Sequence, residues 1–203
     1  MDALVKNAIE GMRKNGFEVV ELHTAKEARD YLAVNIPDGS AVGMGGSISV
    51  RDTGILPVLA EKGCQVLTTW GKKPEDFKRI CMEALAAPVY LTSANAVTRG
   101  GKLVLVDGRG NRTAAVCFGP MQVYFVVSHS KVVDGGINTA VARIKMTACP
   151  QNARRLGLDT PCARTGNCGE DCADSMCRLT LAVDRVPRNR RMTVLFVEET
   201  LGY

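Results

Sequence analysis

A glycine-rich loop, Gly43-Met44-Gly45-Gly46-Ser47, directly follows a short apolar segment at 40–42. Glycines let backbone N–H groups approach an anion closely, and the serine adds a hydroxyl. A dinucleotide fingerprint would need a third glycine where Ile48 stands, and the lysine of a nucleotide-binding P-loop is missing. The loop therefore predicts an anion site that takes neither NAD nor a P-loop nucleotide. The alternative is a tight turn that needs only positive φ.

Two further turns could gather around this loop. Ser93-Ala94-Asn95-Ala96 follows the apolar run 89–92, and Asp107-Gly108-Arg109-Gly110-Asn111-Arg112 follows another. Small polar groups at such ends orient a ligand, and Asp107 is the candidate general base among them. Ordinary hairpin-turn chemistry is the alternative for the second turn. The predicted ligand-binding residues are Gly43, Gly45, Gly46, Ser47, Ser93, Asn95, Asp107, Gly110 and Asn111.

Four cysteines, Cys162, Cys168, Cys172 and Cys177, lie within sixteen residues among loop-forming neighbours. Four thiols in such a loop can converge on zinc or on an iron–sulfur cluster. The spacing contains no C-x2-C pair, so free or paired thiols are the alternative, and Cys149 could join as a fifth ligand. The other cysteines are scattered among apolar residues, as buried free thiols are.

The elements that must position these residues alternate between strand-like and helix-like patterns. This alternation predicts an open α/β domain with a parallel sheet and crossover helices. A β-hairpin is expected where segments 103–106 and 113–118 flank the Asp107 turn, and the segment that carries the cysteines is expected to be loop-like. Helices are expected at 2–15, 24–32, 55–62, 74–86 and 136–145, and further strands at 17–22, 40–42, 65–68, 89–92, 122–128 and 193–197.

The composition is that of a globular protein. Of 203 residues, 46% are hydrophobic and 23% charged, which excludes collagen-like and disordered classes. No apolar run is long enough to span a membrane, and the first residues carry Asp2 and Lys6 in place of an apolar signal core. We therefore expect a soluble, cytoplasmic protein with no membrane partner.

The formal charge of +5 is concentrated in one part of the chain. Residues 143–191 hold ten Lys/Arg and five Asp/Glu, whereas the remainder holds sixteen of each sign. Most of the excess is arginine, which favours bidentate contacts to phosphate or carboxylate. With 5% aromatic residues there is little to stack on bases, so nucleic acid is not the expected partner. We divide this single domain into an α/β body (1–148), a basic cysteine-rich segment (149–191) and a closing strand (192–203).

Taken together, the motifs resemble the LUD-domain (lactate utilisation) family, long labelled a domain of unknown function. They are the glycine loop, the Ser93 and Asp107 turns, Phe118-Gly119-Pro120, Asn152-Ala153-Arg154-Arg155-Leu156 and Thr160-Pro161-Cys162. They appear in the family's order from about residue 40 to 203. The chain looks like the stand-alone, cysteine-rich branch.

The resemblance implies a fold similar to sugar-phosphate isomerases and CoA-transferases, with helices on both faces of an open, mostly parallel sheet. It also implies a pocket at the glycine loop and the two turns. Some relatives act in L-lactate oxidation beside iron–sulfur partner proteins. Two functions follow: binding of an anionic small metabolite in lactate or related carboxylate metabolism, or a metal- or iron–sulfur-dependent redox accessory role for the cysteines. The glycine loop and the Ser93 turn contain no glutamate for a CoA-transferase-like covalent mechanism.

Overall fold

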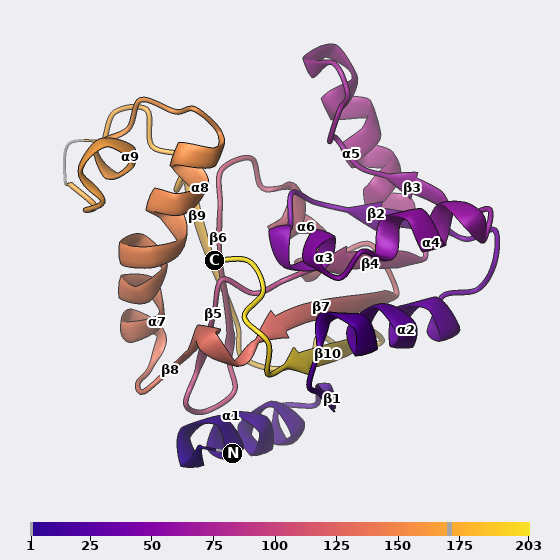
Figure 1. Ribbon diagram of the computed structural model, residues 1–203, viewed down its shortest axis with the longest axis horizontal. Coiled ribbons are helices and arrows are strands. Elements are labelled where there is room, and N and C mark those ends of the chain that lie inside the picture. The colour runs from indigo at the N-terminus through magenta and orange to yellow at the C-terminus, as the bar shows by residue number, and fades with distance from the viewer. Residues whose placement is uncertain (1, 170–171) are drawn as a thin grey trace.

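The computed structural model describes residues 2–169 and 172–203 and contains two sheets with helices packed around them (Figure 1). The larger sheet consists of β1 (Glu18–Leu22), β2 (Ala41–Met44), β3 (Gln65–Leu67), β4 (Val89–Thr92), β7 (Gln122–Ser128) and β10 (Arg191–Val197). The smaller sheet consists of β5 (Ala96–Thr98), β6 (Leu103–Asp107), β8 (Val132–Val133) and β9 (Leu179–Val183).

The helices connect and cover these strands. They are α1 (Ala3–Lys14), α2 (Ala25–Asn35), α3 (Ile48–Asp52), α4 (Ile55–Glu61), α5 (Phe77–Ala86), α6 (Asn111–Cys117), α7 (Ile137–Arg143), α8 (Cys149–Arg155) and α9 (Pro161–Thr165). Single 3₁₀ turns lie at Pro74–Asp76 and His129–Lys131, and a π-helical turn, Ile144–Ala148, joins α7 to α8. In the described residues, no helix is both long and apolar enough to cross a bilayer.

The larger sheet is parallel throughout, in the order β1-β10-β7-β4-β2-β3. After β2 the chain forms β3 on one side, then returns to add β4 on the other side of β2. Open α/β sheets bind ligands at such a reversal, in the crevice beyond the carboxyl ends of the strands. The reversal therefore brings the loops that follow β2 and β4, which hold Ser47 and Ser93, to one edge.

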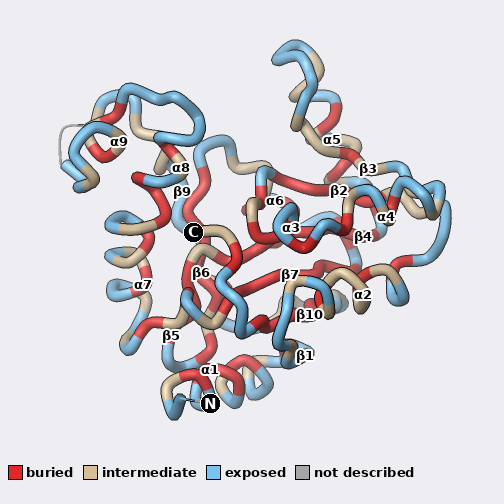
Figure 2. The backbone as a smooth tube through the Cα atoms, viewed as in Figure 1, coloured by how far each residue is buried: buried red, intermediate tan, exposed pale blue. Residues whose placement is uncertain are grey.

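Helices cover both faces of the larger sheet, as expected. Helices α1, α5 and α6 pack on one face, against a layer that includes Tyr90, Phe125 and Phe196. Helices α2, α3 and α4 pack on the other face, against Leu91 and Leu195. Figure 2 shows β7 buried throughout and β10 buried after its first residue, between helices whose outer sides are exposed. The carboxyl edge is thus the place where this sheet remains open to a ligand.

Local capping signals account for the first two helices. Asp2 Oδ1 accepts a hydrogen bond from the Leu4 N–H at 3.1 Å and starts α1. Thr24 Oγ1 accepts from the Glu27 N–H at 3.2 Å and starts α2, while the Glu27 carboxylate accepts from the His23 N–H at 2.7 Å. Both helices therefore begin where the sequence indicates.

The hairpin predicted around the Asp107 turn is wrong, because residues 113–117 of its second expected strand belong to helix α6. The Asp107 carboxylate accepts from the N–H groups of Arg112 and Thr113 at 3.0 and 3.1 Å. Gly110 adopts a left-handed conformation, φ 87°, immediately before α6 begins. A carboxylate that binds the free N–H groups of a first turn starts a helix. Strand β6 instead pairs with β5 and β9, antiparallel to both.

The segment that carries the cysteines is also more regular than the expected loop. It contains α8 and α9, and β9 pairs with β6 to complete the smaller sheet. The closing strand β10 begins at Arg191 and lies between β1 and β7. The basic segment is therefore built onto the body through a sheet and closes one side of the crevice.

Candidate functional site

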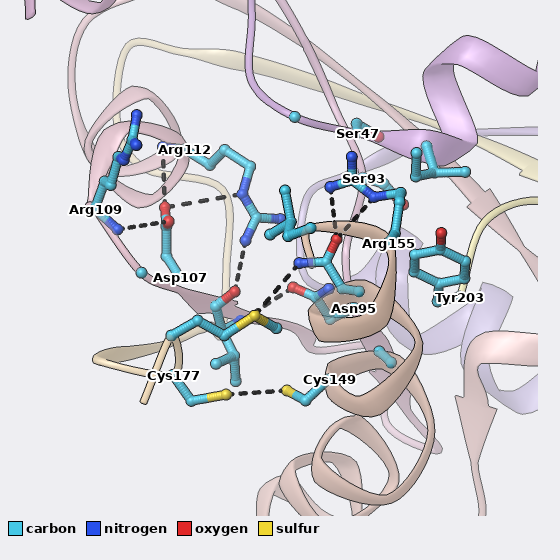
Figure 3. Close-up of a pocket in the computed structure, with 18 of the residues that line it drawn as sticks. Ser47, Ser93, Asn95, Asp107, Arg109, Arg112, Cys149, Arg155, Cys177 and Tyr203 are labelled. Carbon is cyan, nitrogen blue, oxygen red and sulfur yellow. Dashed lines mark hydrogen bonds and ion pairs between the residues drawn. The ribbon is translucent and has the colours of Figure 1, made fainter. Parts of the chain in front are cut away.

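A cavity of about 660 Å³ lies at the carboxyl edge of the larger sheet, between this edge and the smaller sheet with α8 (Figure 3). Its walls come from the loops after β2, β3, β4 and β6, from α8, and from residues 174–178. The C-terminal Tyr203 closes one side. Body and basic segment thus enclose one site together.

Six of the nine predicted ligand-binding residues line this cavity. They are Gly46, Ser47, Ser93, Asn95, Asp107 and Asn111. The other three, Gly43, Gly45 and Gly110, do not line it. Each instead allows a close approach of other atoms or a turn that a side chain would hinder. A Cβ on Gly43 would lie 2.5 Å from the Ala84 carbonyl oxygen, so this glycine lets α5 pack on β2. Gly110 supplies the left-handed turn before α6.

The glycine loop positions an arginine. A Cβ on Gly45 would lie 2.4 Å from Cγ of Arg112, so only glycine admits the arginine stem here. The Ser47 N–H donates to the Gly45 carbonyl at 2.9 Å, and Ser47 Oγ accepts from the Val50 N–H at 3.3 Å. The Ser47 amide expected to face an anion is therefore occupied, while Arg112 lines the cavity.

Asp107 holds this arginine and the first turn of α6. Its carboxylate accepts from three backbone N–H groups, those of Arg109, Arg112 and Thr113, and Arg112 Nε lies 3.9 Å from Oδ2. Burial raises the pKa of Asp107, but Arg112 and the backbone N–H groups outweigh it and hold the pKa below its ordinary value. A carboxylate stabilised in this way is a weak base, so its geometry fits a positioning role.

Three more arginines line the cavity, and sequence reasoning did not place them there. Arg109 lies over the Phe77 ring at 4.6 Å, and Arg155 donates to the Asn152 side-chain oxygen at 2.7 and 3.2 Å. Arg178 lines the wall formed by residues 174–178. Against these, the lining carboxylates of the described residues are Asp107, already engaged, and Asp174. The cavity is therefore electropositive. Arg155 was missed because the sequence of α8 has no helical pattern strong enough to predict that helix.

A buried lysine is the second feature that sequence reasoning missed. Lys131 follows β7, is 3% exposed, and lines the cavity. Its Nζ donates to Ser49 Oγ at 2.7 Å and to Ser93 Oγ at 3.1 Å. Burial, reinforced by the charges of Arg143 and Arg112, lowers the pKa of Lys131 to about 7. The sequence did contain one signal for this lysine, because Lys131 closely follows the strand predicted at 122–128 and so falls at the carboxyl edge of the predicted sheet.

The cysteines surround a second cavity of about 440 Å³. Five of them line it: Cys149, Cys162, Cys168, Cys172 and Cys177. Cys149 Sγ lies 3.1 Å from Cys177 Sγ, and all eight cysteines are free thiols. The hydrogen bond between these two thiols lowers the pKa of Cys177 to about 7 and raises that of Cys149. Within residues 2–169 and 172–203, no three metal-binding side chains converge closely enough to hold an ion.

Comparison with known proteins identifies the family. A model of the LUD domain matches residues 5–197. The chain belongs to the LUD-domain family. The match runs through the body, the basic segment and strand β10, so it includes the lining of the smaller cavity and that of the larger cavity apart from Tyr203. The resemblance drawn from the motifs is thereby confirmed.

A solved structure supports the fold. The LUD domain is similar to a DUF162 family protein from Deinococcus radiodurans, known from a crystal structure, with a TM-score of 0.55 and 16% identity over 96% of each chain. DUF162 is the former name of the LUD domain. A search of curated proteins finds no match. The likeness establishes the α/β architecture, and function must be argued from the site itself.

Proposed function

We propose that this LUD domain binds an anionic small metabolite in the larger cavity. The supporting observation is the four arginines, Arg109, Arg112, Arg155 and Arg178, on the walls of one cavity at the switch point of a parallel sheet. Guanidinium groups bind carboxylate and phosphate through paired hydrogen bonds. The volume of about 660 Å³ is within the range of small-molecule sites.

The family name favours a substrate of lactate or related carboxylate metabolism. In the proposed complex, the arginines neutralise the anion, and Ser93, Asn95 and Asn111 orient the uncharged part of the ligand. Trp70, which stacks under Arg51 at 4.0 Å, supplies an apolar wall. A hydroxycarboxylate or phosphorylated carboxylate would meet both charged and neutral partners in this arrangement.

Anion binding is expected to raise the unfolding temperature of the wild type and to weaken at least about tenfold in Arg155→Gln, since a charged hydrogen bond contributes about 1.5–3 kcal/mol. The probes are L-lactate, ribose 5-phosphate and acetyl-CoA, tested by thermal shift and then by calorimetry. Arg188→Gln is the matched control, because it removes the same charge from an exposed side chain outside the cavity lining. Equal affinities of the two variants, or no shift with any probe, would overturn the proposal.

A second candidate function rests on the five thiols around the smaller cavity. We propose that Cys162, Cys168, Cys172 and Cys177, with Cys149 close by, hold either a structural zinc ion or an iron–sulfur cluster. The cluster would give the protein a redox accessory role beside iron–sulfur partners. Thiolates are the ligands that these soft centres prefer. The donor set fits by chemistry, although no three of these side chains converge closely enough to hold an ion among the residues that the structure describes.

Metal content after anaerobic purification tests this candidate. A brown protein with visible absorption that Cys168→Ser and Cys172→Ser both abolish is the expected result for a cluster, and stoichiometric zinc lost in the same variants is the result for a structural site. Cys64→Ser, which lies outside this cavity, serves as the control and should keep the metal. Metal-free protein whose cavity thiols all react with a thiol reagent would contradict the candidate.

A further inference from the structure

The side chain of Lys131 is buried without a carboxylate partner among the described residues. The side chain is 3% exposed, and its Nζ forms no ion pair with a carboxylate among the residues that the structure describes. Its Nζ contacts three oxygens, those of the Ser49 hydroxyl, the Ser93 hydroxyl and the Ala94 carbonyl, at 2.7, 3.1 and 3.4 Å. Burying an amine costs stability unless something compensates, so a lysine held between two hydroxyl groups calls for a functional explanation.

The sheet topology brings these residues together from distant parts of the chain. Strands β2, β4 and β7 are neighbours in the sheet, and Ser49, Ser93 and Lys131 each lie just beyond the carboxyl end of one of them. All three line the larger cavity. The three functional groups therefore meet on the floor of the crevice that holds the proposed anion site.

The surroundings favour loss of a proton from the Lys131 amine, so that a substantial fraction is neutral near pH 7. The charged groups that act on it are Arg143 from α7 and Arg112 from α6, which disfavour the ammonium, and Asp52 from α3, which favours it more weakly. Burial has the largest effect, and together they lower the pKa of Lys131 to about 7. A desolvated lysine of this kind can accept a proton from a serine hydroxyl.

The two serines have different environments. Ser49 Oγ donates to the Leu201 carbonyl at 3.2 Å, and the C-terminal segment covers it, since a Cβ on Gly202 would lie 2.4 Å from that oxygen. Ser93 lies on the turn after β4 and is labelled on the cavity wall in Figure 3. Both serines are buried, with exposed fractions of 6% for Ser93 and 2% for Ser49, and Ser93 Oγ donates to the Ala94 carbonyl at 3.0 Å. Because no segment in the described part of the chain covers Ser93 as Gly202 covers Ser49, we assign the nucleophile to Ser93 and the fixing of the amine to Ser49.

We propose that Ser93 and Lys131 form a serine–lysine nucleophile pair that hydrolyses an activated acyl compound, an ester or thioester bearing an anionic group. This rests on the proposed function, because the arginines of the cavity would hold the anionic group. Ser93 is the catalytic nucleophile, Lys131 the general base in contact with it, and Ser49 a positioning residue.

The chemical step balances with water as the co-reactant. The Ser93 hydroxyl first turns from the Ala94 carbonyl to the neutral Lys131 Nζ, which accepts its proton as Oγ bonds to the acyl carbon. The bond from that carbon to the leaving oxygen or sulfur then breaks, and the leaving group takes the proton from Lys131. Water attacks the acyl-serine, releases the carboxylic acid and restores the Ser93 hydroxyl.

The test uses mono-p-nitrophenyl succinate, an ester with a free carboxylate, and p-nitrophenyl acetate as its neutral counterpart. The wild type should release one equivalent of p-nitrophenolate in a burst and gain the mass of one succinyl group, mapped to Ser93. Ser93→Ala should abolish the label. Lys131→Met should slow acylation at least about 100-fold and remove its rise with pH near 7.

Two further variants separate catalysis from folding. Ser49→Ala should slow acylation less than Lys131→Met and shift the midpoint of its pH profile. Ser40→Ala, at the amino end of β2 and outside the cavity lining, should react as the wild type does. Thermal unfolding of each variant establishes that it is folded.

Acyl label on any other residue, Lys131 included, would overturn the pair, as would an unchanged rate in Lys131→Met. Binding of succinate without acylation of Ser93 would also overturn it while leaving anion binding intact. Equal reaction of both esters at Ser93, unaffected by Arg155→Gln, would instead support the pair and refute the anion site.

Discussion

Lys131→Met is expected to stabilise the folded chain at pH 6 by about 2 kcal/mol or more. The substitution removes a buried charge whose desolvation cost is compensated by only three hydrogen bonds. The folded-state pKa of about 7 lies below the roughly 10.4 of an unfolded lysine. Between these values the unfolded chain binds more protons than the folded one. The free energy of unfolding of the wild type should therefore rise with pH in this window, by up to about 1.4 kcal/mol per unit.

Urea denaturation at pH 6, 7, 8 and 9 measures this effect as the difference between variant and wild type. The advantage of Lys131→Met should be complete below pH 7 and shrink as the pH rises. Lys131→Arg is the matched control, because a guanidinium keeps its charge throughout this range and should lower stability at every pH. A difference between Lys131→Met and the wild type that is the same at pH 6 and pH 9 would show that Lys131 carries no depressed pKa.

Gly101→Ala is expected to destabilise the chain far more than Gly39→Ala. Both glycines have similar positive φ, 74° and 71°, so both substitutions carry the same left-handed strain. A Cβ on Gly101 would lie 2.0 Å from the Met12 backbone nitrogen, whereas one on Gly39 would meet no atom within 4 Å. The excess cost of Gly101→Ala, about 2–4 kcal/mol, measures how closely α1 packs on the turn between β5 and β6.

Thermal unfolding followed by circular dichroism gives the comparison. The contact is backbone against backbone, and the Asn15 side chain donates to the Gly100 carbonyl at 3.0 Å beside it, so the helix cannot shift without losing this bond. Undocking α1 would expose Ile9 and Met12, which are buried. An equal loss of stability in Gly101→Ala and Gly39→Ala would mean that α1 can move away from the added methyl group at little free-energy cost.

The parallel sheet was predictable because its strands are apolar runs with clear boundaries. Helix α1 was predictable because its apolar residues recur at helical spacing, and α2 because Thr24 is a residue type that starts helices. Helix α6 was not, since Thr113 and Val116 are β-branched residues that favour a strand. What decides the conformation is the Asp107 carboxylate, which binds the first turn of α6. Prediction from sequence compares the helix and strand propensities of the residues in the segment. The cap instead depends on β6 ending at Asp107, which places its carboxylate against the first turn of α6.

The smaller sheet escaped prediction for a related reason. Strand β8 has two residues and β5 three, and β9 joins β6 from more than seventy residues away. Such short, non-local pairings leave no periodic signal in the sequence. The candidate site shows the same limit, because loops after strands could be placed at one edge, but Lys131, Arg155 and Tyr203 reach the cavity through tertiary packing.

The Cys149–Cys177 pair lines both cavities, so the two compartments share a wall made in part of two sulfur atoms. A molecule that fills the larger compartment as far as this wall is expected to change the affinity of both sulfurs for a proton or a metal ion. By thermodynamic reciprocity, a proton or metal ion bound at the sulfurs would then change the affinity for that molecule by the same factor. Ligand binding in the larger cavity and the state of the Cys149 and Cys177 thiols are therefore linked. Ligand affinity should be measured at a fixed thiol state, and thiol titration at a fixed ligand concentration.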